Sequence, residues 1–243
     1  MIKASAVVVA AGSGRRFKSK IPKILIGLGK KPILLYSLLE LAGHPQISDI
    51  VVVANVACLG QVKKIIKKYR IKKINSLVLG GERRQDSVLR GLNAVKGNAR
   101  LVLIHDAVRP FIGKKEITAV IEEAAKTGAA ILAVPVKATI KRVKMIGTPV
   151  PGTKDPGPRV VGVVEQTLKR DELWEAQTPQ VYKKFLVVQA YARFGGDTVT
   201  DEASVVEKAG IKVSVVAGSY FNIKITTPED LIIAEGIIKK RKA

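Results

Sequence analysis

The chain has 243 residues, of which 42 are Lys or Arg and 20 are Asp or Glu, and its formal net charge at pH 7 is +22. Hydrophobic residues make up 47% of the chain, which is enough to build a buried core and excludes disorder as the expected state. A single cysteine, no signal-peptide pattern and no apolar run of about 18 residues lead us to expect a cytoplasmic protein without a membrane partner.

Short apolar runs alternate with helical patterns in the first half of the chain. The runs are nearly apolar throughout, as in parallel strands that are covered on both faces. The predicted strands are 5–10, 49–54, 76–79, 100–104 and 130–136, and the predicted helices are 32–42, 57–69, 84–95 and 115–127. This alternation predicts βαβ units and an α/β fold, with a Rossmann-like, open, mostly parallel sheet in a single domain, 1–243.

The alternation ends after Val136. Two predicted strands, 139–143 and 160–167, flank a segment rich in Gly and Pro, which indicates a projecting β-arm over 139–167. Regular elements then resume as helices at 181–193 and 201–209, strands at 212–217 and 222–226, and a helix that begins at Pro228.

A glycine-containing turn follows the first predicted strand. Its sequence is Ala10-Ala11-Gly12-Ser13-Gly14-Arg15-Arg16, and Lys23 comes shortly afterwards. Glycines at this place let main-chain amides approach an anion, but the spacing fits neither a dinucleotide fingerprint nor a Walker A loop. The turn therefore predicts a polyphosphate site, and a tight turn with solvated basic side chains is the alternative.

Two further clusters follow predicted strands. In Gly80–Ser87, the side chains of Asp86 and Ser87 either cap a helix or bind a ligand, and the sequence leaves both interpretations open. In His105–Pro110, Asp106 is a candidate for magnesium, directly or through water, and Arg109 for a phosphate, while His105 is more typical of a structural hydrogen-bonding group.

The last cluster is spread over the second half of the chain. It comprises Arg170, Leu173–Gln180, Thr200–Ser204 and Asn222–Thr226. Taken without a functional meaning, Trp174 belongs to the core, Thr200 caps a helix, and Lys224 lies on a surface strand.

Together these motifs resemble the 2-C-methyl-D-erythritol 4-phosphate cytidylyltransferase family, from about residue 3 to residue 238. The later motifs are the more specific ones. Ribitol 5-phosphate cytidylyltransferases share the glycine turn, His-Asp-x-x-Arg-Pro and Gln-Thr-Pro-Gln, whereas Leu173-Trp174-x-Ala176 and Thr200-Asp201-Glu202-Ala203-Ser204 are more similar to the methylerythritol branch. Ile24 follows Lys23 where the family usually has Gln, and the arm tip is longer than usual.

The resemblance implies a nucleotidyltransferase fold and a monofunctional enzyme that joins CTP to 2-C-methyl-D-erythritol 4-phosphate with Mg²⁺ or another divalent cation, as a homodimer through the 139–167 arm. It implies that Arg16 and Lys23 stabilise charge on the phosphates, and that Arg170 and Lys224 hold the methylerythritol phosphate. The implied substrate-binding residues are Ala10, Ala11, Gly12, Gly14, Gly81, Asp86, Ser87, Asp106, Ala107, Arg109, Thr139 and Thr178.

Two alternatives remain open at this point. In the first alternative, the protein is a cytidylyltransferase whose acceptor is another polyol phosphate, such as ribitol 5-phosphate. In the second, the charge of +22 indicates a basic protein that binds nucleic acid. The second is less favoured, because the lysines are spread along the chain and five Tyr, five Phe and one Trp offer few stacking platforms.

Overall fold

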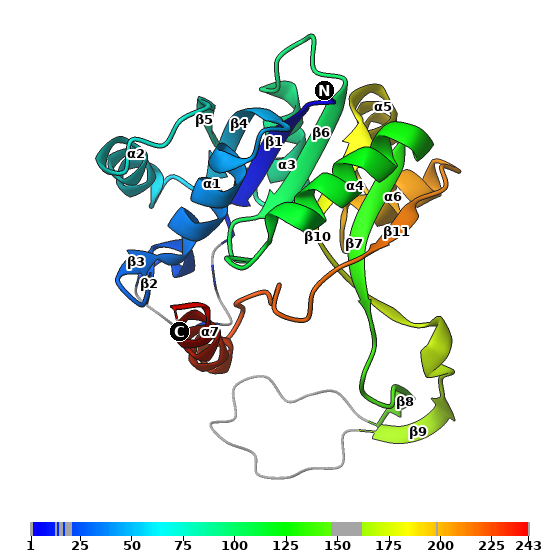
Figure 1. Cartoon of the computed structure of the whole chain (residues 1–243). Helices are drawn as coiled ribbons and strands as arrows, with labels where there is room; N and C mark the ends of the chain where they lie inside the picture. Colours follow the sequence, from blue (N-terminus) through cyan, green and yellow to red (C-terminus); the bar gives the residue numbers. More distant parts are fainter. Residues whose placement is uncertain are drawn as a thin grey trace. The chain divides into compact units, whose positions relative to one another are not determined.

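The computed structural model describes residues 2–12, 14, 17, 21–146, 162–197 and 199–242 (Figure 1). Seven strands form one sheet in the order β11-β7-β10-β6-β1-β4-β5. Their bounds are β1 Ala4–Ala10, β4 Ile47–Ala54, β5 Ile74–Leu79, β6 Leu101–Asp106, β7 Ala129–Pro135, β10 Trp174–Lys183 and β11 Ser214–Ala217. The strand β1 pairs in parallel with β4 and β6, and β10 runs antiparallel to β6. The predicted open, mostly parallel α/β sheet is confirmed.

Helices cover both faces of the sheet, which explains why its central strands are apolar throughout. Their bounds are α1 Ile33–Gly43, α2 Leu59–Lys68, α3 Arg84–Asn93, α4 Lys114–Thr127, α5 Lys184–Phe194, α6 Glu202–Lys208 and α7 Pro228–Lys242. Successive side chains of β1 enter different cores: Ala6 and Val8 pack with α1 and α4, whereas Val7 and Val9 pack with α3 and α5. The carboxyl end of β1 is thus fixed between two helical layers.

Short elements complete the description. A ribbon of β2 (Gly27–Leu28) and β3 (Lys31–Pro32) precedes α1, and β8 (Lys141–Met145) pairs with β9 (Gly162–Thr167). The chain divides into two compact units, one of Met1–Ala133 with Ala176–Ala243 and one of Val134–Glu175. The predicted arm, 139–167, lies within the second unit, and its predicted tip lies largely outside the described residues.

Several sequence-based expectations for the second half are wrong. The strand β10 was not predicted, and because it extends to Lys183, α5 begins at Lys184 rather than at residue 181. Residues 222–226 form no strand. The cap of α6 is Asp201, whose carboxylate accepts the Ser204 amide at 3.0 Å, and not Thr200. The side chain of Trp174 is 46% exposed and is not part of the core.

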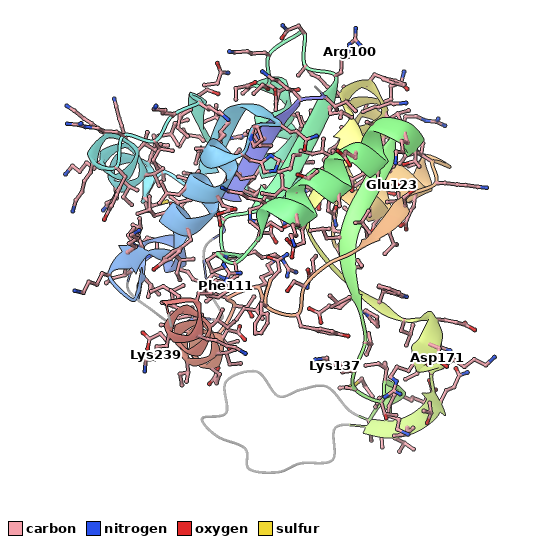
Figure 2. All side chains as sticks on the ribbon, viewed as in Figure 1. Arg100, Phe111, Glu123, Lys137, Asp171 and Lys239 are labelled. Atoms are coloured by element: carbon pink, nitrogen blue, oxygen red, sulfur yellow. The ribbon has the colours of Figure 1, made fainter. Side chains whose placement is uncertain are left out.

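Charged side chains are distributed over several elements. Figure 2 shows nitrogen-tipped side chains around α2, at Arg100 and at Lys239, on separate parts of the first unit. Within the described residues, no helix is both long enough and apolar enough to cross a membrane.

Candidate active site

A cavity of about 570 Å³ opens at the carboxyl ends of β1, β4, β5 and β6. Parallel strands place the segments that follow them at one edge of the sheet, which is where α/β proteins bind ligands. Residues from several predicted motifs line the cavity, together with neighbours that were not predicted: Ala10, Ala11, Gly12, Gly14, Lys23, Asn55, Gly81, Glu82, Arg83, Arg84, Ser87, Asp106 and Lys224. The fold therefore brings residues from Ala10, near the start of the chain, to Lys224, near its end, into one pocket.

The glycine turn after β1 leaves its main chain open to this cavity. Gly14 has a φ of +66°, and a Cβ there would come within 3.3 Å of the Lys23 Cβ, so this position suits glycine alone. A Cβ on Gly12 would meet nothing within 4 Å, so a ligand can approach the main chain there. Arg16, which was predicted to act on the phosphates, lies outside the described residues.

The loop between β5 and α3 is held by the two side chains whose role the sequence left open. The carboxylate of Asp86 accepts the Arg83 amide at 3.0 Å, and the Ser87 hydroxyl accepts the Gly81 amide at 3.0 Å. A Cβ on Gly80 would lie 2.3 Å from that of Ala11, so the loop packs directly against the glycine turn. These contacts are those of the capping interpretation, and a contact of Gly81, Asp86 or Ser87 with the nucleotide stays a prediction.

The carboxylate of Asp106 is the centre of a charge network on the wall of the cavity. Arg84 donates to its Oδ1 at 2.8 and 3.1 Å, and the Lys224 ammonium lies 2.6 Å from its Oδ2. Burial alone would raise the pKa of the Asp106 carboxyl, but Arg84 and Lys224 hold it below its usual range. Asp106 is therefore ionised at neutral pH and fixes the direction of two cations.

Arg84 also pairs with Glu202, the first residue of α6. The Glu202 side chain is 1% exposed, and Tyr191 donates its hydroxyl to Oε1 at 3.3 Å. Neither Arg84 nor Glu202 was singled out by the sequence. Arg83 and Arg84 are adjacent and chemically identical in the sequence, and both line the cavity, but Arg84 pairs with Asp106 and Glu202 whereas Arg83 pairs with Asp86.

His105 is a neutral, buried side chain that is linked to Asp106 through Thr178. Burial lowers the pKa of His105 to about 4. Its Nε2–H donates to the Arg109 carbonyl at 3.1 Å, and its Nδ1 accepts the Thr178 hydroxyl at 3.2 Å. The same Thr178 oxygen accepts the Asp106 amide at 3.0 Å. The prediction that His105 is a structural group is confirmed.

Arg109 holds the segment that carries Lys224. Its guanidinium donates to the Asn222 carbonyl at 2.7 Å and to the Ala176 carbonyl at 3.3 Å, and its side chain is buried. The Ile225 amide donates to the Val108 carbonyl at 2.9 Å, so residues 222–226 are tied to the loop after β6 and not to a strand. The arginine fork expected for a phosphate is thus occupied by main-chain carbonyls, and Ala107 and Thr178 are likewise buried.

The remaining predicted residues lie in the second unit. Thr139 is exposed, and the exposed Arg170 donates to the Lys137 carbonyl at 3.0 Å. Their predicted contacts with the acceptor remain predictions.

A magnesium ion fits this pocket only as a partner of phosphates. Among the described residues, no group of three His, Cys, Asp or Glu side chains could hold a metal. Magnesium needs only one or two carboxylates when substrate phosphates supply other ligands, and Asp106 provides one.

The comparisons with known proteins agree with these motifs. A family model described as 2-C-methyl-D-erythritol 4-phosphate cytidylyltransferase matches residues 4–240. A protein of that name from Halalkalibacterium halodurans is 42% identical over 240 residues, which cover 98% of each chain. Another from Alkaliphilus metalliredigens is 44% identical over 246 residues, which cover 99% of this chain and 95% of the relative.

Solved structures show the same fold. The crystal structure of 4-diphosphocytidyl-2C-methyl-D-erythritol synthase from Anaerococcus prevotii has a TM-score of 0.80 and 31% identity, and the match covers 98% of this chain and 96% of that one. The match to the 2-C-methyl-D-erythritol 4-phosphate cytidylyltransferase of Thermus thermophilus has a TM-score of 0.73 and 26% identity, and it covers 96% and 98% of the two chains. The resemblance stated from the motifs is confirmed, and the chain belongs to the 2-C-methyl-D-erythritol 4-phosphate cytidylyltransferase family.

Proposed function

We propose that the pocket around Asp106 joins CTP to 2-C-methyl-D-erythritol 4-phosphate and releases 4-diphosphocytidyl-2-C-methyl-D-erythritol and pyrophosphate. The observation that carries this proposal is the charge of the pocket wall. Four cationic residues, Lys23, Arg83, Arg84 and Lys224, line the cavity together with the glycine turn, against two acidic ones. Such a pocket suits two substrates that both bring phosphate groups.

The reaction needs charge neutralisation more than it needs a base. A phosphate oxygen of the acceptor attacks the α-phosphorus of CTP, and the bond from that phosphorus to the bridging oxygen of the leaving pyrophosphate breaks. The acceptor phosphate is already an anion at neutral pH, so no group has to remove a proton from it. This chemistry fits a pocket whose nearest histidine, His105, is buried and neutral. Catalysis then consists of positioning and electrostatic stabilisation.

The glycine turn and Lys23 suit the triphosphate. The main chain at Gly12 has room for phosphate oxygens, and Gly14 and Lys23 line the same cavity. The charge on the α-phosphate and on the leaving group grows in the transition state, so the ammonium group of Lys23 acts mainly there. Arg16 would join it, on the ground of the family motif.

Lys224 suits the acceptor phosphate. The carboxylate of Asp106 binds one side of its ammonium group, and a lysine has three donors, so two remain for a ligand. Arg84 holds Asp106 in turn and so sets the direction of Lys224. Arg170 is the second candidate for this phosphate, again from the family motif.

Magnesium would be held by the triphosphate and by Asp106, directly or through water. When bound it would neutralise charge on the triphosphate. Lys224 and Arg84 already contact the two oxygens of Asp106 and would remain its partners.

A homodimer through the arm and a cytoplasmic location complete the proposal. On β8 and β9, the side chains of Val143, Met145, Val163 and Val164 are 40–57% exposed, and a second copy of the arm would cover them. The single, buried cysteine suits a reducing compartment.

Pyrophosphate release, measured with CTP, Mg²⁺ and each acceptor in turn, tests the proposal. We expect turnover with 2-C-methyl-D-erythritol 4-phosphate and much slower turnover with ribitol 5-phosphate. Faster turnover with ribitol 5-phosphate would mean that ribitol 5-phosphate, and not 2-C-methyl-D-erythritol 4-phosphate, is the acceptor. No turnover with either acceptor, together with salt-sensitive binding to duplex DNA, would favour the nucleic-acid alternative.

A further inference from the structure

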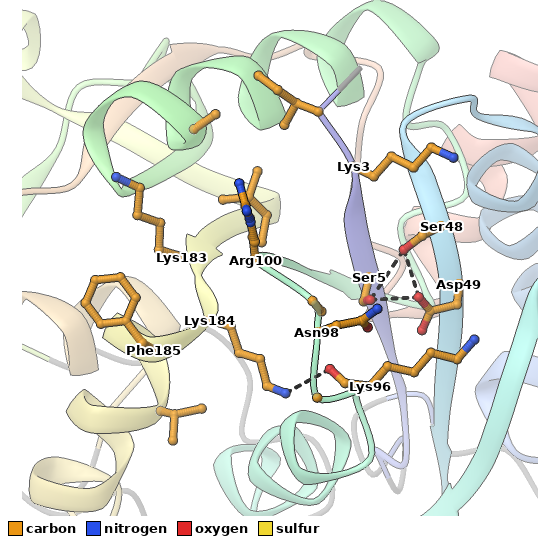
Figure 3. A pocket seen from close by; sticks show the side chains of 16 residues that line it. Lys3, Ser5, Ser48, Asp49, Lys96, Asn98, Arg100, Lys183, Lys184 and Phe185 are labelled. Atoms are coloured by element: carbon orange, nitrogen blue, oxygen red, sulfur yellow. Dashed lines mark hydrogen bonds between the residues drawn. The ribbon is translucent and has the colours of Figure 1, made fainter.

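A second and larger cavity, of about 1220 Å³, lies at the opposite edge of the sheet (Figure 3). It is formed where β1, β4 and β6 begin, together with the end of β10, the start of α5 and the loop before β6. Ser5 of β1 lines this cavity and Ala10 lines the first one. At about 3.3 Å per strand residue, the two positions are about 17 Å apart, so these are separate sites on one strand.

A buried carboxylate with an unused oxygen forms the floor of this cavity. Asp49 is 6% exposed, and its Oδ2 accepts the hydroxyls of Ser5 at 2.8 Å and Ser48 at 2.7 Å. Its Oδ1 has no hydrogen-bond partner among the described residues. Figure 3 shows Ser5 and Ser48 next to the Asp49 carboxylate and the side chain of Lys96 running past it. A buried acceptor in this state costs free energy until a donor reaches it.

Cationic side chains surround the floor. Lys3, Lys96, Arg100 and Lys183 line the cavity, and none of them forms an ion pair within the described part of the chain. A fifth cation, Lys184, donates to the Lys96 carbonyl at 3.0 Å. Four unpaired cations against one carboxylate select a ligand with a net negative charge of two or more, which excludes a metal cation and an amino acid zwitterion.

Apolar side chains and the amide of Asn98 complete the lining. Of the apolar side chains, Leu101 is buried and Phe185 is exposed. The requirements are thus a dianionic group for the cations, a hydrogen-bond donor for Asp49 Oδ1 and a carbon frame between them.

We propose that this cavity binds a small phosphorylated polyol or sugar. The phosphate would pair with Arg100 and the lysines, and a hydroxyl group would donate to Asp49 Oδ1. A phosphate monoester carries nearly two negative charges at neutral pH, which matches the excess of cations. The site is independent of the pocket around Asp106 and does not depend on the reaction proposed for it.

The test uses three probes by isothermal titration of the full chain. D-ribose 5-phosphate has both the charge and the hydroxyl groups, sulfate has only the charge, and D-ribose has only the hydroxyl groups. We expect saturable binding of D-ribose 5-phosphate, weaker binding of sulfate, and no binding of D-ribose at the same concentrations.

The readout is the ratio of the sulfate Kd to the D-ribose 5-phosphate Kd. In Asp49→Asn this ratio should fall about tenfold, because a charge-assisted hydrogen bond to the ligand is replaced by a neutral one. The side chain of Lys96 is exposed, and Lys96→Gln should weaken the binding of both D-ribose 5-phosphate and sulfate, so that the ratio of their Kd values stays unchanged. Lys224→Gln, at the position proposed for the acceptor phosphate in the other cavity, should change neither Kd.

Three outcomes would overturn the proposal. The first is a ratio of the two Kd values that Asp49→Asn leaves unchanged. The second is loss of D-ribose 5-phosphate binding in Lys224→Gln, and the third is no saturable binding of D-ribose 5-phosphate at millimolar concentration. If Asp49→Asn does not fold, the variants Lys96→Gln and Arg100→Gln test the proposal instead. Each must then weaken D-ribose 5-phosphate binding relative to the unmodified chain.

Discussion

Replacement of Arg84 by Gln should lower both the stability and the activity of the protein, for different reasons. Arg84 joins Asp106 to Glu202, whose side chain is 1% exposed. Removing one partner of a buried ion pair costs about 3–5 kcal/mol, and we take about 3 kcal/mol because 29% of the Arg84 side chain is exposed. In a chain of this size, 1 kcal/mol shifts Tm by about 2–4 °C, so the expected loss is about 6–12 °C.

A second substitution separates the two effects. In Arg84→Gln/Glu202→Gln no charge is left stranded, so most of the lost Tm should return. The value of kcat/KM should stay low, because Asp106 still lacks one of the two cations that orient it. Calorimetry and pyrophosphate release measure the two quantities on the same samples.

Arg83 provides the matched control for Arg84. Its side chain is 50% exposed and pairs with Asp86 on the surface, where ion pairs contribute little, so Arg83→Gln should leave Tm nearly unchanged. Equal Tm values for the Arg83 and Arg84 variants, or no recovery in the double variant, would refute the reasoning.

Four other predictions concern the pockets, the core and the arm. Lys23→Ala should lower kcat with little change in KM for CTP, because it removes about 2.7–4 kcal/mol of transition-state stabilisation. An unchanged kcat with a raised KM would assign Lys23 to ground-state binding. Arg170→Ala and Lys224→Ala should each raise KM for the polyol phosphate or lower kcat, and isothermal titration should show nearly unchanged affinity for CTP with Mg²⁺; a large loss would place the residue in the nucleotide site. Because burial lowers the pKa of His105 to about 4, from about 6.5 in the unfolded chain, the unfolded state binds more protons between these values, and stability should fall by about 3 kcal/mol from pH 6.5 to pH 4. Urea unfolding of His105→Asn should show a flatter pH dependence in that range, and an equal slope would contradict a buried neutral His105. Ultracentrifugation should find a dimer at micromolar concentration, and a monomer would remove the proposed role of the arm.

The first half of the fold could be predicted because its signal is local. In β1 and β4 nearly every residue is apolar, since helices cover both faces, and such runs are recognisable without any partner. The strand β10 gives no such signal. It buries Gln177, Thr178 and Gln180, whose polar groups are satisfied by Asn222, by Asp106 and by Asp201 with Ala203. These partners are distant in the sequence, so polar residues that look exposed are in fact central.

The candidate site could be predicted as a set of motifs but not as a network. The turn Gly12–Gly14 and the segment around Asp106 both follow apolar strands, and the topology alone brings them to one edge. The pairing of Arg84 with Glu202 spans more than a hundred residues and leaves no pattern in the chain. The segment Asn222–Thr226 alternates like a strand, yet hydrogen bonds to Val108 and Arg109 replace a strand ladder.

The most direct test of the central claim is to identify which bond of CTP the protein breaks. Phosphorus NMR of a mixture of the protein, CTP, Mg²⁺ and 2-C-methyl-D-erythritol 4-phosphate resolves the products. Attack at the α-phosphorus predicts free pyrophosphate and two coupled signals from the new diphosphate ester, in equal amounts. Formation of CDP with inorganic phosphate, or of CDP with a phosphorylated acceptor, would mean that the γ-phosphorus is attacked and would contradict the account.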